Sequence, residues 1–144
     1  MRNRWRFASP ATAIAIIALF FAIGGGAVVA QTTQGGSSPT FTKLTLQNGW
    51  SGSPFGTRKP AVALVNGIVV FKGAMATSGN DPVPFTLPRS FRPSGLVFVS
   101  VGLCNANPGR LQIEPTGVVT VEAQGGAFSN AACFTGLDGA SFAK

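Results

Sequence analysis

The chain has 144 residues, of which 45% are hydrophobic and only 10% charged, with 19 glycines, 10 prolines and no histidine. This length allows one domain with a modest core, and the glycine and proline content favours short strands joined by turns. The net charge is +7, but three of the 11 basic residues lie within the first six positions and the others are scattered. Sequence-independent binding of nucleic acid needs clustered Lys and Arg. The charge distribution therefore argues against nucleic acid as a partner.

Residues 1–30 form the first predicted element, a targeting segment. Arginines precede an uncharged run from Phe7 to Ala30, which is the pattern of a secretory signal cleaved before Gln31. The alternatives are a retained membrane anchor, since residues 11–30 supply about the 20 apolar residues of a bilayer span, or a buried helix. The segment resembles the short leaders of many actinobacterial surface proteins. Whether this segment is cleaved or retained as an anchor, it is expected to place the rest of the chain outside the cytoplasm. The chain would then be secreted or attached to the cell surface.

Residues 31–40 are polar and uncharged, the composition of a flexible linker. From Phe41 the pattern alternates, with Leu44 and Leu46 apolar and polar residues between them, which predicts a half-buried strand over 41–46. Asn48-Gly49 predicts a turn, and the glycines and prolines of 51–59 predict a loop. The folded domain is therefore expected to occupy residues 41–144.

A β-hairpin is predicted over residues 61–72. Its centre is Asn66-Gly67, because these two residues accept the positive φ that a two-residue type I′ turn requires. Val65 should then pair with Ile68. Farther from the turn, Leu64 should pair with Val69 and Val62 with Phe71. These pairs form the bulkier face of the hairpin, which is predicted to pack on the core.

Residues 83–93 are apolar but contain three prolines, so they are expected to form an edge strand followed by a corner. In this prediction Phe85 and Leu87 anchor a crossing between two sheets. A longer strand follows over 96–103, with its core face at Val97, Val99, Val101 and Leu103. The opposite face of this strand is apolar only at Leu96 and Phe98, near its N-terminal end. We expect another part of the chain to cover the strand at that end.

A second hairpin is predicted from residues 110–114 and 118–122. Pro115-Thr116-Gly117 suits a type I turn closed by a glycine bulge. The expected pairs are Leu111 with Val121 and Ile113 with Val119 inside, and Arg110 with Glu122 outside.

Three motifs stand in a characteristic order: Asn48-Gly49-Trp50, then Phe85-Thr86-Leu87-Pro88 with Phe91-Arg92-Pro93, then Leu137-Asp138-Gly139-Ala140-Ser141-Phe142. In this order they resemble the C-terminal β-sandwich domain of many phage tail fibres, which also occurs on bacterial surface proteins. The chain departs from that pattern in having Phe91 for Tyr and an inserted segment over 130–134. The resemblance implies an all-β fold, an antiparallel, jelly-roll-like sandwich, that is commonly trimeric and serves as a binding head for cell-surface glycans.

Few residues suit catalysis. The only carboxylates are Asp81, Glu114, Glu122 and Asp138; the glutamates fit the solvent face of the second hairpin and the aspartates fit turns. A glycosidase pair of Asp81 and Asp138 is the remaining enzymatic alternative. The pattern contains no metal-ligand cluster or phosphate-binding glycine loop, so we expect no enzyme, no metal and no cofactor.

The candidate binding residues are aromatic and cationic: Trp50, Phe55, Arg58, Lys59 and Arg92. Trp50 and Phe55 bracket a glycine-rich loop, where an aromatic side chain either stacks on a sugar or, for Trp50, fills the core. The cations are either solvated loop charges or partners of an anionic glycan. The expected function is an extracellular, non-catalytic adhesion module for cell-surface saccharide; the alternative is a structural trimerising or capping module without its own ligand.

Cys104 and Cys133 are the only cysteines, and the leader sends the chain to a compartment where disulfides persist. We therefore predict that they form a disulfide, with two unrelated buried thiols as the alternative. The bridge would tie the inserted segment to the sandwich.

Overall fold

The computed structural model describes residues 38–144, and Ser37–Lys144 forms one compact unit. The leader and hydrophobic helix predicted for residues 1–30 lie outside the described residues. No helix between residues 38 and 144 is long and apolar enough to cross a membrane.

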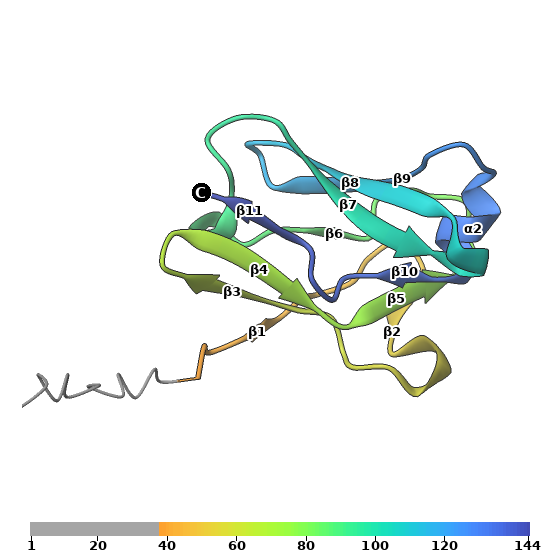
Figure 1. Cartoon of the computed structure of the whole chain (residues 1–144), viewed down its shortest axis with the longest axis horizontal. Coiled ribbons are helices and arrows are strands. Elements are labelled where there is room, and N and C mark those ends of the chain that lie inside the picture. Colours follow the sequence, from red (N-terminus) through yellow and green to blue (C-terminus); the bar gives the residue numbers. More distant parts are fainter. Residues whose placement is uncertain (1–37) are drawn as a thin grey trace, which may run out of the picture. The chain divides into compact units, whose positions relative to one another are not determined.

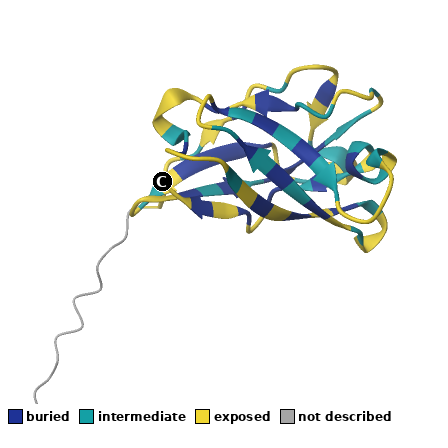
Figure 2. Cartoon of the chain, turned by 90° about the horizontal axis from the view of Figure 1, so that it is seen from above, coloured by how far each residue is buried: buried dark blue, intermediate teal, exposed yellow. Residues whose placement is uncertain are grey.

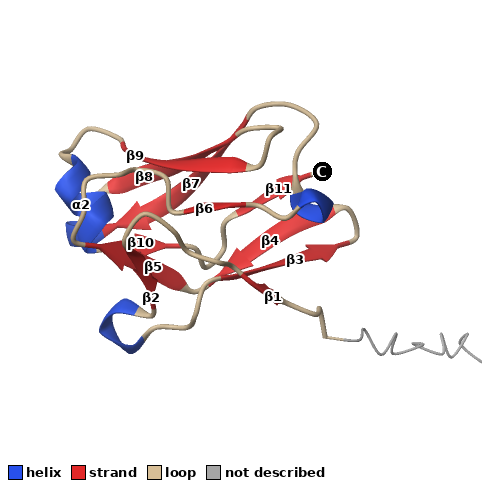
Figure 3. Cartoon of the chain, turned by 180° about the vertical axis from the view of Figure 1, so that it is seen from behind, coloured by secondary structure: helices blue, strands red, loops and turns tan. Residues whose placement is uncertain are grey.

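The fold is all-β, with one short α-helix and three 3₁₀ turns among the described residues (Figures 1 and 3). The strands are β1 (Thr42–Lys43), β2 (Trp50–Gly52), β3 (Ala61–Val65), β4 (Ile68–Lys72), β5 (Ala74–Thr77), β6 (Phe85–Thr86), β7 (Val97–Leu103), β8 (Pro108–Ile113), β9 (Val118–Ala123), β10 (Thr135–Gly136) and β11 (Ser141–Ala143). The helical elements are η1 (Pro54–Gly56), η2 (Arg89–Phe91), η3 (Cys104–Ala106) and α2 (Phe128–Cys133).

The strands form two antiparallel sheets. The smaller has the order β1-β3-β4-β11 and the larger the order β2-β5-β10-β7-β8-β9-β6. Their inner faces contribute to one hydrophobic core, visible as the buried segments of the strands in Figure 2. The predicted all-β architecture of two antiparallel sheets is thus confirmed, whereas its description as a jelly roll stays a prediction.

Both predicted hairpins are present with the predicted registers. Asn66 and Gly67 have φ of 50° and 81°, and the pairs run from Val65–Ile68 outward. In the second hairpin Leu111 pairs with Val121 and Ile113 with Val119. One core assignment was wrong: Leu64 is 45% exposed although its partner Val69 is fully buried, since Leu64 lies in the second pair from the turn, at the open end of the first hairpin.

The proline-rich segment is confirmed as an edge strand and a corner. β6 is the last strand of the larger sheet, and η2 follows it. Phe85 and Leu87 are fully buried. The ring of Phe85 lies 6.3 Å from that of Phe71 in β4, on the other sheet. These side chains therefore connect the two layers.

The predicted cover over the first end of β7 is absent. Leu96 and Phe98 are each 51% exposed. Phe98 instead lies against the guanidinium of Arg110, 4.4 Å from its ring centroid, and Arg110 also bonds Glu122 as expected. A cation–π contact of this kind shields part of the ring and leaves the sheet face open to solvent.

Several elements were not expected from the pattern. The segment predicted as a 51–59 loop begins within β2, which pairs with β5, and β5 itself was missed. The helix α2 occupies the inserted segment. The strand predicted over 41–46 is assigned only at Thr42–Lys43, although Leu44 is buried and Lys43 and Thr45 are exposed as the alternation requires.

The chain changes sheets at two adjoining points. β4 in the smaller sheet continues through Gly73 into β5 of the larger sheet, and β10 of the larger sheet continues through 137–140 into β11 of the smaller one (Figure 1). The two crossings are bonded to each other, since Leu137 N–H donates to Gly73 O at 2.8 Å. The closing Leu-Asp-Gly motif therefore fixes the point where both sheets meet.

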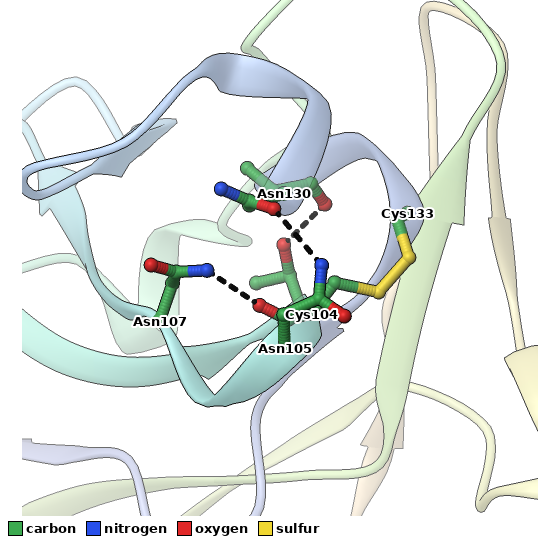
Figure 4. The surroundings of a disulfide bond; sticks show 7 residues. Cys104, Asn105, Asn107, Asn130 and Cys133 are labelled. Atoms are coloured by element: carbon green, nitrogen blue, oxygen red, sulfur yellow. Dashed lines mark hydrogen bonds between the residues drawn. A yellow bond between two sulfur atoms is a disulfide. The ribbon is translucent and has the colours of Figure 1, made fainter.

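A disulfide joins Cys104 and Cys133, as predicted (Figure 4). It connects η3, which follows β7, to the last residue of α2. Beside it Asn107 Nδ2 donates to Cys104 O at 3.1 Å, and Thr135 Oγ1 donates to Ala131 O at 2.8 Å. The inserted helix is thus tied to the sandwich at its C-terminal end.

Candidate binding site

Trp50 lies in the core. It is 6% exposed, its indole N–H donates to Asp81 O at 2.8 Å, and Phe128 of α2 meets it edge to face at 6.3 Å. Because a stacking platform needs an open ring face, this arrangement favours the core alternative for Trp50.

Arg92 is bonded within the fold. Its Nε donates to Leu87 O at 2.9 Å, and the chain at Gly117 approaches so closely that a Cβ there would lie 2.5 Å from this Nε. Arg92 thereby braces the corner after β6, which is joined to the turn of the second hairpin by the bond from Leu87 N–H to Gly117 O at 2.8 Å.

Phe55, Arg58 and Lys59 share one loop, between β2 and β3. Phe55 has φ of 54° within η1 and is 81% exposed, with its ring 6.2 Å from that of Phe134. Arg58 and Lys59 are also exposed. Of the predicted site residues, these three are therefore exposed on one loop, whereas Trp50 and Arg92 are engaged within the fold.

The second half of this loop is held against the sheet crossing. Asp138 Oδ1 accepts from the Gly73 N–H at 2.9 Å and from Arg58 Nη2 at 2.7 Å. Ala74 N–H donates to Arg58 O at 3.1 Å. The backbone of Arg58 and Lys59 is therefore fixed although both side chains reach solvent.

Two hollows lie on either side of Lys59 and Pro60, which line both. The larger has a volume of about 440 Å³, and its lining includes Trp50 and the hydroxyl residues Thr45, Ser51 and Ser53. The smaller, of about 320 Å³, is lined by Phe41, Lys43, Arg58, Lys59, Pro60, Ala61 and Lys72. We call these the hydroxyl hollow and the cationic hollow. Lys43 also lines both.

Strand register explains the cationic hollow. Ala61 of β3 pairs with Lys43 on one side and with Lys72 on the other, and directly opposed residues in a sheet point to the same face. The outer face of the smaller sheet thus carries two lysines across one small alanine. Lys72 Nζ lies 3.9 Å from the ring centroid of Phe41.

Sequence reasoning missed Lys43 and Lys72 as site residues. The hairpin register already set Lys72 opposite Ala61, and the alternation after Phe41 put Lys43 on a polar face. What the sequence did not show was the pairing of β1 with β3, which brings the two lysines together.

All four carboxylates of the chain take part in bonds within the fold. Asp81 Oδ1 accepts from Val83 N–H at 2.8 Å, and Asp138 holds Gly73 and Arg58. Glu122 pairs with Arg110, and Glu114 accepts from Thr116 Oγ1 at 3.0 Å. These carboxylates therefore form turns and register contacts, as expected from the sequence.

No protein-family model and no curated protein matches this chain. Among solved structures, the crystal structure of the receptor binding protein (gp15) of Listeria phage PSA is similar, with a TM-score of 0.59 over 96% of this chain and 80% of that chain, at 20% identity. The fold is therefore one that a phage receptor binding protein also uses.

Proposed function

We propose that residues 38–144 form a non-catalytic binding module that recognises a cell-surface saccharide and is displayed outside the cytoplasm. The observation that carries the proposal is the pair of hollows on either side of Lys59 and Pro60. The likeness to a phage receptor binding protein supports it, since that protein is described as binding a receptor.

The two hollows suit sugar recognition in size and chemistry. Their volumes of about 440 and 320 Å³ fall in the range of small-molecule sites. Thr45, Ser51 and Ser53 offer hydroxyls that both donate and accept, and half-buried Leu46 offers an apolar wall. Phe55, whose ring is 81% exposed, follows Ser53 by two positions in the sequence but lines neither hollow. A saccharide presents hydroxyls and apolar ring faces that match these groups.

The non-catalytic part of the proposal is supported by the carboxylates. Each is already engaged in a turn, an ion pair or a backbone bond. Glycoside hydrolysis by the usual route needs two carboxyl groups free to act on either side of one bond. Asp81 and Asp138 are instead used to shape the backbone.

A saccharide-binding assay tests the proposal. The full chain, purified in a neutral detergent, is screened on a glycan array, and affinities for the retained glycans are measured by calorimetry. Lys59→Gln is expected to weaken binding about tenfold, because it removes a charge-assisted hydrogen bond donor shared by both hollows. Arg89→Gln, which changes an exposed cation outside the hollows, is the matched control. An array without any saturable binding would contradict the proposal.

Exposed apolar side chains favour a second candidate function, a structural module that trimerises or caps a surface protein. Leu64, Ile68, Leu96 and Phe98 are 39–51% exposed, and exposed apolar side chains that gather in one patch commonly mark a protein–protein interface. On this basis light scattering of the full chain, corrected for detergent, should give about three times the monomer mass. A monomer at micromolar concentration would count against this function.

A further inference from the structure

We infer that the saccharide is anionic, and that its phosphate or carboxylate group binds in the cationic hollow while the attached sugar occupies the hydroxyl hollow. This inference rests on the proposed function and assigns a ligand class to it. Lys43, Lys59 and Lys72 are the residues that would bind the anion.

The first support is the charge of the hollow. Four of its seven lining residues are basic and none is acidic. Arg58 is neutralised by Asp138, and within residues 38–144 the other ion pair joins Arg110 to Glu122. The three lysines of the hollow therefore have no carboxylate partner among the described residues.

The second support is how the fold places Lys43 and Lys72. Neighbouring strands lie about 4.8 Å apart, so residues two strands apart on one row are separated by roughly 10 Å. Lys43 and Lys72 occupy such positions on either side of Ala61, a buried residue with a small side chain that lines the floor of the cationic hollow. At this separation salt largely screens the repulsion between the two ammonium groups, and an anion bound between them accepts charge-assisted hydrogen bonds from both.

The third support is the chemistry of the shared wall. Lys43, Lys59 and Pro60 line both hollows, so one ligand that extends past them meets cations on one side and hydroxyl groups on the other. Ser51 keeps only a long bond of 3.4 Å to Ala76 O, which leaves its hydroxyl available. A sugar that carries a phosphate or carboxylate has the matching order of groups.

The anionic part of the ligand is tested by calorimetry with the full chain and four probes. These are a glycosylated glycerol-phosphate polymer, polygalacturonate, neutral dextran and sugar-free polyphosphate. We expect at least one of the two anionic saccharides to bind at least about tenfold more tightly than dextran and polyphosphate, with affinity falling as salt rises. The polymer that binds identifies phosphate or carboxylate as the group.

Two double variants with the same net charge locate the site. Lys43→Gln/Lys72→Gln is expected to weaken binding of the anionic saccharide at least about tenfold. Arg89→Gln/Lys144→Gln removes two exposed cations that line neither hollow, and is expected to change affinity by less than about twofold. Far-ultraviolet circular dichroism verifies that both variants remain folded.

Four results would overturn the inference. Dextran binding as tightly as the charged polymers would remove the need for an anion, although the proposed function would survive. Polyphosphate binding as tightly would remove the sugar. Equal losses in the two double variants would show that net charge, rather than the cationic hollow, drives binding. If no saccharide binds, neutral or charged, both the inference and the proposed function fail.

Discussion

Loss of the Cys104–Cys133 disulfide is expected to lower the free energy of unfolding by about 3.5 kcal/mol. The bridge spans 29 residues of sequence, and opening a loop of this length restores conformational entropy to the unfolded chain. A small domain has a total stability of roughly 5–15 kcal/mol, so the loss removes a large share of it.

The helix α2 is expected to respond first. It has six residues, which is too short for a helix to be stable alone. Within the helix Ala131 is fully buried and Phe128 packs on Trp50. The C-terminal end of α2, however, is held by the disulfide. Reduction of the bridge should therefore speed hydrogen exchange of the backbone amides of residues 128–133 more than that of the amides in β7–β9.

The measurement is urea unfolding of the full chain followed by circular dichroism. Cys104→Ser/Cys133→Ser is compared with the wild type, each with and without reductant. Reductant should shift the wild-type transition to that of the double variant and leave the variant unchanged. Coincident transitions for the oxidised wild type and the variant would contradict the prediction.

The sequence predicted those parts of the fold that are encoded by neighbouring residues. Asn66-Gly67 determines its own turn, and once the turn is known the alternation of the flanking residues gives the register. The second hairpin follows from the same reasoning around Gly117. The edge position of β6 follows from proline chemistry, because Pro84 and Pro88 have no N–H to donate.

Elements that are held in place by residues distant in the sequence were missed, because their own residues do not encode them. β2 and β5 are short strands that depend on each other and, for β5, on β10, and their sequences do not alternate clearly. α2 has no N-cap side chain and only one buried residue, so it lacks a helical signal. Its position depends on the disulfide and on Trp50.

The candidate site was predicted in part. Arg58 and Lys59 were found because two adjacent cations interrupt an otherwise uncharged loop. Lys43 and Lys72 are 29 positions apart in the sequence, and only the β1–β3 pairing sets them on either side of Ala61. A site assembled across three strands becomes visible once the register of all three is known.

Replacement of Gly73 by alanine is expected to destabilise the domain by about 2–5 kcal/mol. Gly73 has φ of 92°, where an L side chain is strained by roughly 1–2 kcal/mol. An added Cβ would also lie 2.5 Å from Lys59 O and 2.6 Å from Arg58 O. Backbone atoms cannot rotate away as a side chain does, so overpacking adds about 1–3 kcal/mol.

Gly67→Ala is the matched control, because it separates strain from overpacking. Gly67 has a similar φ of 81°, but nothing lies within 4 Å of an added Cβ, so its loss should remain near 1–2 kcal/mol. Urea unfolding measures both variants, and equal losses would contradict the proposed clash.

Moving the carbonyls of Arg58 and Lys59 also displaces the wall between the two hollows. Gly73→Ala, measured below its unfolding transition, should therefore weaken saccharide binding, whereas Gly67→Ala should leave it unchanged.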